Sequence, residues 1–96
     1  MVIRICDDIV YREVDGSIVT LSLTSGEYVG LDAVGSHIWR LIEQDGRKES
    51  IRRGLLAEFD LDDQACDEEL DGFLSMLTAK GLVTIDGSRL RTQGSG

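Results

Sequence analysis

The residues that most often carry out chemistry are few in this sequence. It has one histidine, His37, and two cysteines, Cys6 and Cys66, which lie far apart. His37 has no serine or cysteine with a matching acid near it, as nucleophilic catalysis would need. A zinc site needs about four ligands at suitable spacing, and no GxxxxGK phosphate loop is present. The residue types therefore predict no catalytic residue, no metal site and no cofactor, and the protein is not expected to be an enzyme.

Carboxylates are the most abundant ionisable groups. Eighteen Asp and Glu residues stand against ten Lys and Arg residues, for a formal net charge of −8. General acid–base catalysis needs carboxylates in a cleft, whereas many of these acids fall on one predicted helix and are typical of a solvated face. Asp67, Glu69 and Asp71 could alternatively attract a basic residue of a ligand. The charge also disfavours nucleic acid, which is bound through clustered cations.

A three-stranded antiparallel meander is predicted in the first third of the chain. Asp15-Gly16 separates the alternating runs "IVYREV" and "SIVTLSL", which is a strong signal for a two-residue hairpin. A turn at "TSGE" then leads into a third strand, "EYVGL", from Glu27 to Leu31. Both the first and the third strand of this meander are edges.

Three helices are predicted to follow. Asp32 is a candidate N-cap of a helix that ends at Gly46, and its predicted buried stripe comprises Val34, Ile38, Leu41 and Ile42. A second helix starts near Lys48. The third and longest helix runs from Asp62, a candidate N-cap, to Lys80. Its apolar stripe comprises Cys66, Leu70, Phe73, Leu74 and Leu77, with Met76 beside it.

The expected fold class is α+β and winged-helix-like, with a further small hairpin around Asp86-Gly87. Residues 1–90 are expected to form a single domain and residues 91–96 a flexible tail. No apolar run approaches the roughly 20 residues of a membrane span, and the N-terminus has no secretory signal pattern. We therefore expect a cytoplasmic protein without a membrane partner.

The third strand presents the most informative feature, an open edge without the Lys, Pro or bulge that usually protects one. An extended peptide could add there as a fourth strand, with Phe73 and Met76 of the third helix as an apolar wall. Two alternatives stay open. A dimer could pair this strand across a two-fold axis, and an acidic winged-helix regulator could bind DNA through Arg52 and Arg53.

Three segments also resemble the PqqD-like family of peptide-recognition domains. They are "EYVGLDAVGSHIWRLI", "IRRGLLAEFDLD" and "FLSMLTAKGLV", which occur in the order and spacing of the family's motifs. The resemblance covers about Val10 to Ile85.

The resemblance implies a three-stranded sheet beside three helices and a function without catalysis. Family members bind the leader segment of a ribosomally made precursor peptide, which adds to the third strand and lies against the third helix. A free-standing chain of this size is most similar to the leader-binding proteins of lasso-peptide pathways. The implied partners are then the leader peptide, a separate leader peptidase of the cysteine protease class and a cyclase. The alternative within the family is a peptide chaperone for a radical enzyme of the quinone cofactor pathway.

Projected onto this sequence, the resemblance predicts a peptide-binding site on the third strand and the third helix. Leu31 is expected to be a core residue, and Gly30 to let a second backbone approach closely. The predicted site residues are Glu27, Tyr28, Val29, Gly30, Leu31, Cys66, Glu69, Leu70, Phe73 and Met76.

Overall fold

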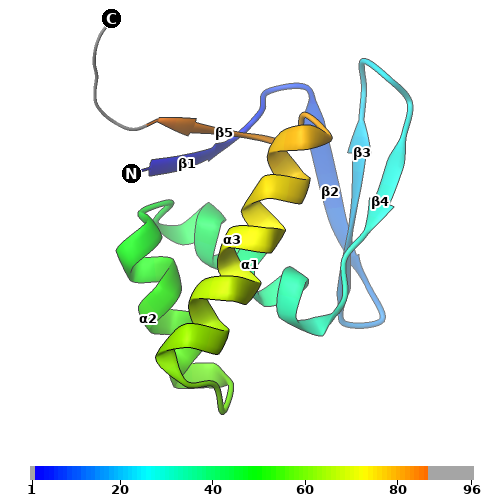
Figure 1. The fold of residues 1–96 in the computed structure, drawn as a ribbon. Helices are drawn as coiled ribbons and strands as arrows, with labels where there is room; N and C mark the ends of the chain where they lie inside the picture. The colour runs from blue at the N-terminus through cyan, green and yellow to red at the C-terminus, as the bar shows by residue number, and fades with distance from the viewer. Residues whose placement is uncertain (1, 87–96) are drawn as a thin grey trace, which may run out of the picture.

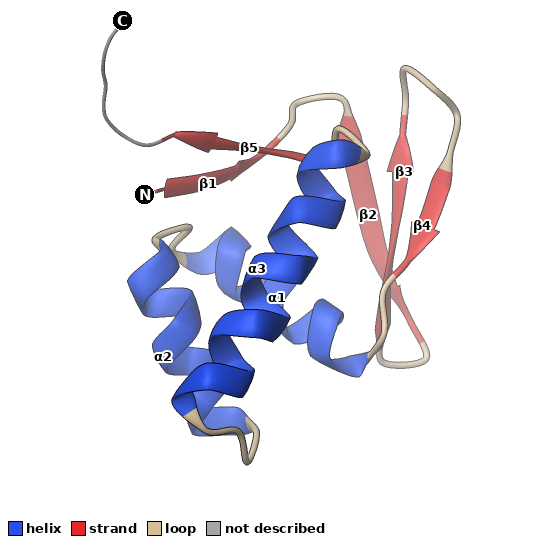
Figure 2. Cartoon of the chain, in the orientation of Figure 1, coloured by secondary structure: helices blue, strands red, loops and turns tan. Residues whose placement is uncertain are grey.

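The computed structural model describes residues 2–86 and contains two small sheets and three helices (Figure 1). The elements follow one another as β1 (Val2–Ile5), β2 (Ile9–Val14), β3 (Ser17–Ser22), β4 (Tyr28–Gly30), α1 (Ala33–Gln44), α2 (Lys48–Glu58), α3 (Asp63–Ala79) and β5 (Val83–Asp86). In Figure 2 the helices form one group, with the β2-β3-β4 sheet to one side of it. The predicted α+β class, a meander followed by three helices, is confirmed.

The β2-β3-β4 sheet is the predicted antiparallel meander. Its first turn holds Asp15 at φ 52° and Gly16 at φ 85°, the pair of left-handed residues that a type I′ hairpin requires. The register places Val10 opposite Leu21 and Leu21 opposite Tyr28. This register turns Ile18, Thr20 and Ser22 of β3 towards the core, where all three are buried.

The second sheet pairs the N-terminal strand with the last described one. β1 and β5 are antiparallel, with Ile3 opposite Ile85 and Ile5 opposite Val83. The sequence predicted a local hairpin around Asp86-Gly87 and no strand at the N-terminus. The first arm of that hairpin is β5, but its partner in the structure is β1, and the second arm lies outside the described residues.

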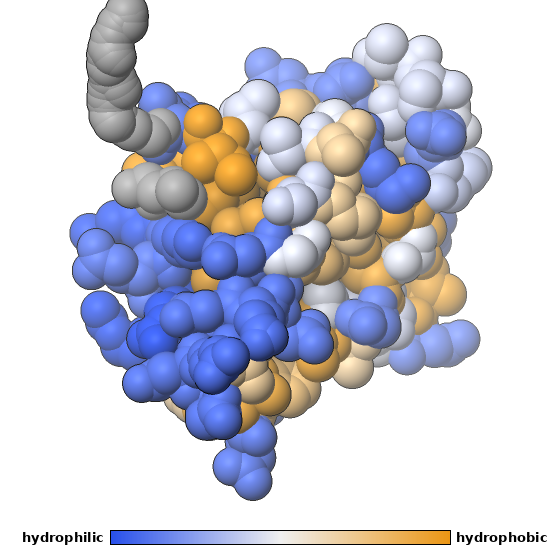
Figure 3. Space-filling model, viewed as in Figure 1, coloured by the Kyte–Doolittle hydropathy of each residue, from blue (hydrophilic) through white to orange (hydrophobic). Residues whose placement is uncertain are grey.

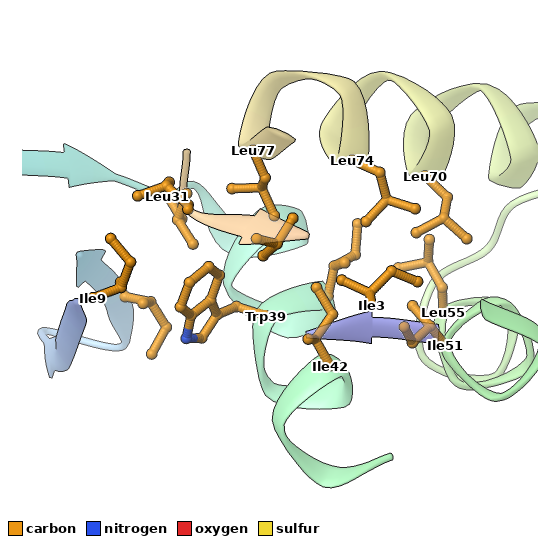
Figure 4. Packing of buried hydrophobic residues seen from close by; sticks show 14 of the residues in the cluster. Ile3, Ile9, Leu31, Trp39, Ile42, Ile51, Leu55, Leu70, Leu74 and Leu77 are labelled. Carbon is orange, nitrogen blue, oxygen red and sulfur yellow. The ribbon is translucent and has the colours of Figure 1, made fainter. Parts of the chain in front are cut away.

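The three helices begin and pack as their sequence patterns indicate. The carboxylates of Asp32 and Asp62 accept the backbone N–H groups of Gly35 and Ala65, each at 2.7 Å, so both predicted N-caps are confirmed. Trp39 is fully enclosed, with the ring of Tyr11 edge-on to it at 5.3 Å between centroids. Figure 4 shows Trp39 among aliphatic side chains from both sheets and all three helices. None of the described helices is long and apolar enough to cross a membrane.

Candidate functional site

The outer edge of β4 carries no paired strand within the described residues. The Ser22 N–H donates to the Glu27 carbonyl at 3.0 Å, and the Leu31 N–H donates to the Ile18 carbonyl at 2.8 Å. Backbone groups alternate in direction along a strand, so the N–H and C=O groups of Tyr28 and Gly30 point away from β3. We call these four groups the open edge of β4.

A buried serine holds the end of β4 to the first turn of α1. Ser36 Oγ accepts the N–H of Ile18 at 2.8 Å and donates to the carbonyl of Leu31 at 3.3 Å. Ser36 has no exposed surface, so water cannot replace either bond. The hydroxyl therefore fixes how the strand turns into the helix.

Replacing this serine is expected to weaken the junction. Ser36→Ala would leave a buried donor and a buried acceptor unpaired, which costs about 1–3 kcal/mol of unfolding free energy. Urea unfolding followed by circular dichroism measures the loss. Ser75→Ala, at an exposed position of α3, is the matched control and should stay within about 0.5 kcal/mol of the parent. Equal stability of the two variants would contradict the proposed role of Ser36.

Two half-buried apolar side chains of α3 form a surface that we call the helix wall. Phe73 and Met76 both pack against the core without being enclosed in it. A Cβ atom at Gly35 would lie 2.8 Å from Phe73 Cε1, so the phenyl ring rests against the first turn of α1 where a larger residue would displace it. Figure 3 shows hydrophobic residues on this face of the molecule, from α3 towards β4.

An open cavity of about 390 Å³ lies between the first turn of α1 and the N-terminal half of α3. We call it the α1–α3 cavity. The cavity lies near the end of β4, because its lining residue Asp32 is only two residues after Gly30, the last residue of that strand. The lining residues are Asp32, Val34, Gly35, Ile38, Leu61, Ala65, Glu68, Glu69, Gly72 and Phe73.

The predicted strand residues divide by the face on which they lie. Tyr28 is 72% exposed and Glu27 and Gly30 are also exposed, whereas Val29 is half-buried. Leu31 is buried, so its expected place in the core is confirmed. The strand β4 thus has an exposed outer face and an inner face that continues into the core.

The predicted helix residues divide in the same way. Glu69 and Phe73 line the α1–α3 cavity, and Met76 is half-buried. Cys66 and Leu70 have no exposed surface. Cys66 Sγ lies 3.7 Å from the Arg52 carbonyl, and burial raises the pKa of this thiol. Cys66 and Leu70 can therefore affect a ligand only through the position of α3.

The cavity residues of α1, namely Val34, Gly35 and Ile38, were not among the predicted site residues. A signal was present, because Asp32 was predicted both to follow the strand and to cap the helix. A helix that begins directly at the end of an edge strand must place its first turn beside that edge. The apolar periodicity instead assigned Val34 and Ile38 to the core stripe alone.

The acids of α3 fall into two groups. Asp63, Asp67 and Asp71 face α2, where Arg52 lies 2.6 Å from Asp67 and 3.4 Å from Asp63, and Lys48 lies 2.7 Å from Asp71. The hydrogen bond that Arg52 donates to the Asp67 carboxylate raises the pKa of the guanidinium. Glu68 and Glu69 lie on the other side, at the cavity, and neither forms an ion pair within residues 2–86.

Other candidate chemistry is not assembled in the described part of the chain. The ring of His37 packs edge-on to Phe59 at 5.5 Å. Between residues 2 and 86, no three His, Cys, Asp or Glu side chains are grouped as a metal site would require.

The fold and the site define a small α+β domain in which the open edge of β4 leads towards the α1–α3 cavity. This chain belongs to the PqqD family, because the family model described as coenzyme PQQ synthesis protein D (PqqD) matches residues 17–83. No curated protein matches it.

Two solved structures are similar over most of the chain. TbiB1 in complex with the TbiA(beta) leader peptide has 38% sequence identity and a TM-score of 0.82, and the match covers 88% of this chain and 99% of that one. Lasso peptide synthetase B1 complexed with the leader peptide has 18% identity and a TM-score of 0.80, and the match covers 88% of this chain and 100% of that one. At 18% identity, the second match shows a similarity of fold alone.

Proposed function

We propose that this chain binds the leader segment of a ribosomally made precursor peptide by β-strand addition at the open edge of β4. The observation that carries the proposal is the outward direction of the Tyr28 and Gly30 backbone groups beside the wall of Phe73 and Met76. The 38% identity with TbiB1, which is in complex with the TbiA(beta) leader peptide, supports leader binding. Within this proposal the precursor is of the lasso-peptide class, as the resemblance in the sequence implies. The bound leader would then be delivered to a separate leader peptidase, with a cyclase acting later.

Strand addition suits this edge on physical grounds. A ladder of main-chain hydrogen bonds supplies affinity without regard to sequence, while alternate side chains enter pockets and supply specificity. A leader residue opposite Val29 would face inwards, towards α3. Ordering a flexible leader costs free energy that offsets part of the contribution of the ladder. Side chains buried against Phe73 and Met76 would therefore add to the net affinity as well as to the specificity.

The proposal includes a binding role without catalysis and a cytoplasmic site of action, where precursor peptides are synthesised. An alternative within the family is a peptide chaperone of the quinone cofactor pathway, which the name of the matched family model favours. The two differ in the precursor that binds. DNA binding is less favourable, because the helix that would enter the groove, α3, carries acids over its first half.

The test is a titration with fluorescent leader peptides, including the TbiA(beta) leader, against the parent chain and Tyr28→Pro. Proline removes the outward N–H of Tyr28 and leaves the bonds to β3 in place. We expect at least a tenfold loss of affinity, about 1.4 kcal/mol. Phe73→Ala should weaken binding to a similar extent by removing the apolar wall.

The matched control is a proline on the opposite edge of the sheet. The Ile18 carbonyl accepts from Leu31, so the backbone of Ile18 is turned towards β4, and its partner Glu13 points its N–H away from β3. Glu13→Pro therefore removes an equivalent outward donor from β2 and should leave leader affinity within about twofold of the parent. Equal losses in Tyr28→Pro and Glu13→Pro would argue against the β4 edge. Failure of every leader to bind the folded parent would overturn the function.

A further inference from the structure

We propose that the α1–α3 cavity binds a basic side chain, lysine or arginine, carried by the leader just outside the segment paired with β4. This inference rests on the proposed function and specifies the chemistry of one contact. It concerns the cavity walls of this chain, where an apolar floor meets three carboxylates. Asp32 accepts the Gly35 N–H as the cap of α1, whereas Glu68 and Glu69 form no ion pair within residues 2–86.

The position of the cavity makes it the continuation of the open edge. Asp32 lines the cavity and is separated from Gly30, the last residue of β4, by one residue. A peptide paired with Tyr28 and Gly30 that extends past this end of β4 would therefore come close to the cavity. The segment in the cavity is next to the paired segment in the leader sequence.

The floor of the cavity suits a chain of methylene groups. Ile38 is fully buried, and Leu61 and Phe73 are half-buried around the opening. Lysine and arginine bury their aliphatic stems on apolar surface and keep the charged end in water. The volume of about 390 Å³ accommodates one such side chain.

The rim supplies the complementary charge. Helical spacing puts Ala65, Glu68, Glu69, Gly72 and Phe73 on one face of α3, while Asp63, Asp67 and Asp71 lie on the neighbouring face. Each acid of the second group is paired with Lys48 or Arg52 of α2. Glu68 and Glu69 have no such partner within residues 2–86, and no lysine or arginine lines the cavity.

A cation at this rim is favoured over other occupants. A carboxylate of the leader would meet like charge from Glu68 and Glu69, which destabilises binding. A neutral aliphatic side chain would fill the floor but leave the charge of the rim unmatched. The overall charge of −8 adds a long-range attraction for basic peptides.

The test separates the ammonium group from its stem. In the leader that binds most tightly, each position flanking the paired segment is replaced in turn by lysine, by norleucine and by glutamate. The peptides are titrated against the parent chain, against Glu68→Gln/Glu69→Gln, and against Asp7→Asn/Glu58→Gln. The last variant makes the same change in net charge at exposed positions outside the cavity lining.

At one or two adjacent positions we expect the parent to bind the lysine peptide about three- to tenfold more tightly than the norleucine peptide, as for a partly exposed ion pair. Glutamate should be the weakest there. The preference should disappear in Glu68→Gln/Glu69→Gln and persist in Asp7→Asn/Glu58→Gln. It should also shrink as salt is raised, because the rim is open to solvent.

Three results would overturn the inference while leaving the proposed function in place. They are equal affinity for lysine and norleucine at every position, a preference for norleucine next to the strand, and a lysine preference that both double variants lose equally. If no leader binds the parent chain, or if Tyr28→Pro leaves the leader affinity unchanged, the proposed function is overturned and this inference with it.

Discussion

Leu70→Ala is expected to lower the free energy of unfolding by about 2–5 kcal/mol, as large-to-small changes in a close-packed core do. Leu70 has no exposed surface, and its side chain lies between α3 and the other core residues (Figure 4). The core around the cavity left behind would relax only partially, so the cavity would not collapse fully. For a chain of this size such a loss is a large part of the total stability.

Chemical unfolding measures this loss, and leader affinity at low denaturant shows whether Leu70 has a second role. We expect the molecules that remain folded to bind the leader nearly as well as the parent does. Met76→Ala, on the same helix but half-buried, is the comparison and should affect leader affinity more than stability. A Leu70→Ala protein that is as stable as the parent and no longer binds leader would make Leu70 a contact residue, as the sequence analysis supposed.

Gly46→Ala is expected to cost about 2–4 kcal/mol, more than the 1–2 kcal/mol of a left-handed alanine alone. Gly46 has φ 79°, and a Cβ added there would lie 2.8 Å from the backbone carbonyl oxygen of Ile3. The Ile3 N–H donates to the Gly46 carbonyl at 2.7 Å. The methyl group would therefore push β1 away from the loop between α1 and α2.

Gly81→Ala is the matched control for this change. Gly81 has φ 75° and ends α3 as a left-handed residue, but a Cβ there would meet nothing within 4 Å. Its variant should show the conformational cost alone. The difference between the two unfolding free energies then measures the crowding against Ile3, and a difference near zero would mean that β1 moves without cost.

Local features of the fold were predictable because each depends on a few neighbouring residues. Asp15-Gly16 determines a hairpin through its φ angles, and Asp32 and Asp62 determine helix starts through one hydrogen bond each. The pairing of β1 with β5 depends instead on segments at opposite ends of the described chain. A strand of four residues carries too little alternation to reveal a distant partner.

The strand edge and the helix of the candidate site were predictable from the sequence, but which of their side chains are exposed was not. The periodicity of α3 placed Cys66, Leu70 and Phe73 in one stripe, although the structure encloses the first two and leaves the third half-buried. The packing of α3 against the other helices decides which of these side chains are enclosed. An apolar stripe that is wider than the contact between helices leaves the side chains along one of its sides partly exposed. The division of the α3 acids between α2 and the cavity has the same origin, since only packing shows which carboxylates meet Lys48 and Arg52.

The enclosure of Trp39 determines what optical spectroscopy can observe in this protein. It is the sole tryptophan, and its indole Nε1 is buried without a hydrogen-bond partner in the described structure. Its emission should therefore lie at short wavelength and move sharply to longer wavelength when denaturant exposes the ring. A ligand bound at the surface would leave Trp39 enclosed. Tryptophan emission would therefore report the unfolding of each variant, while a dye on the leader peptide independently reports binding.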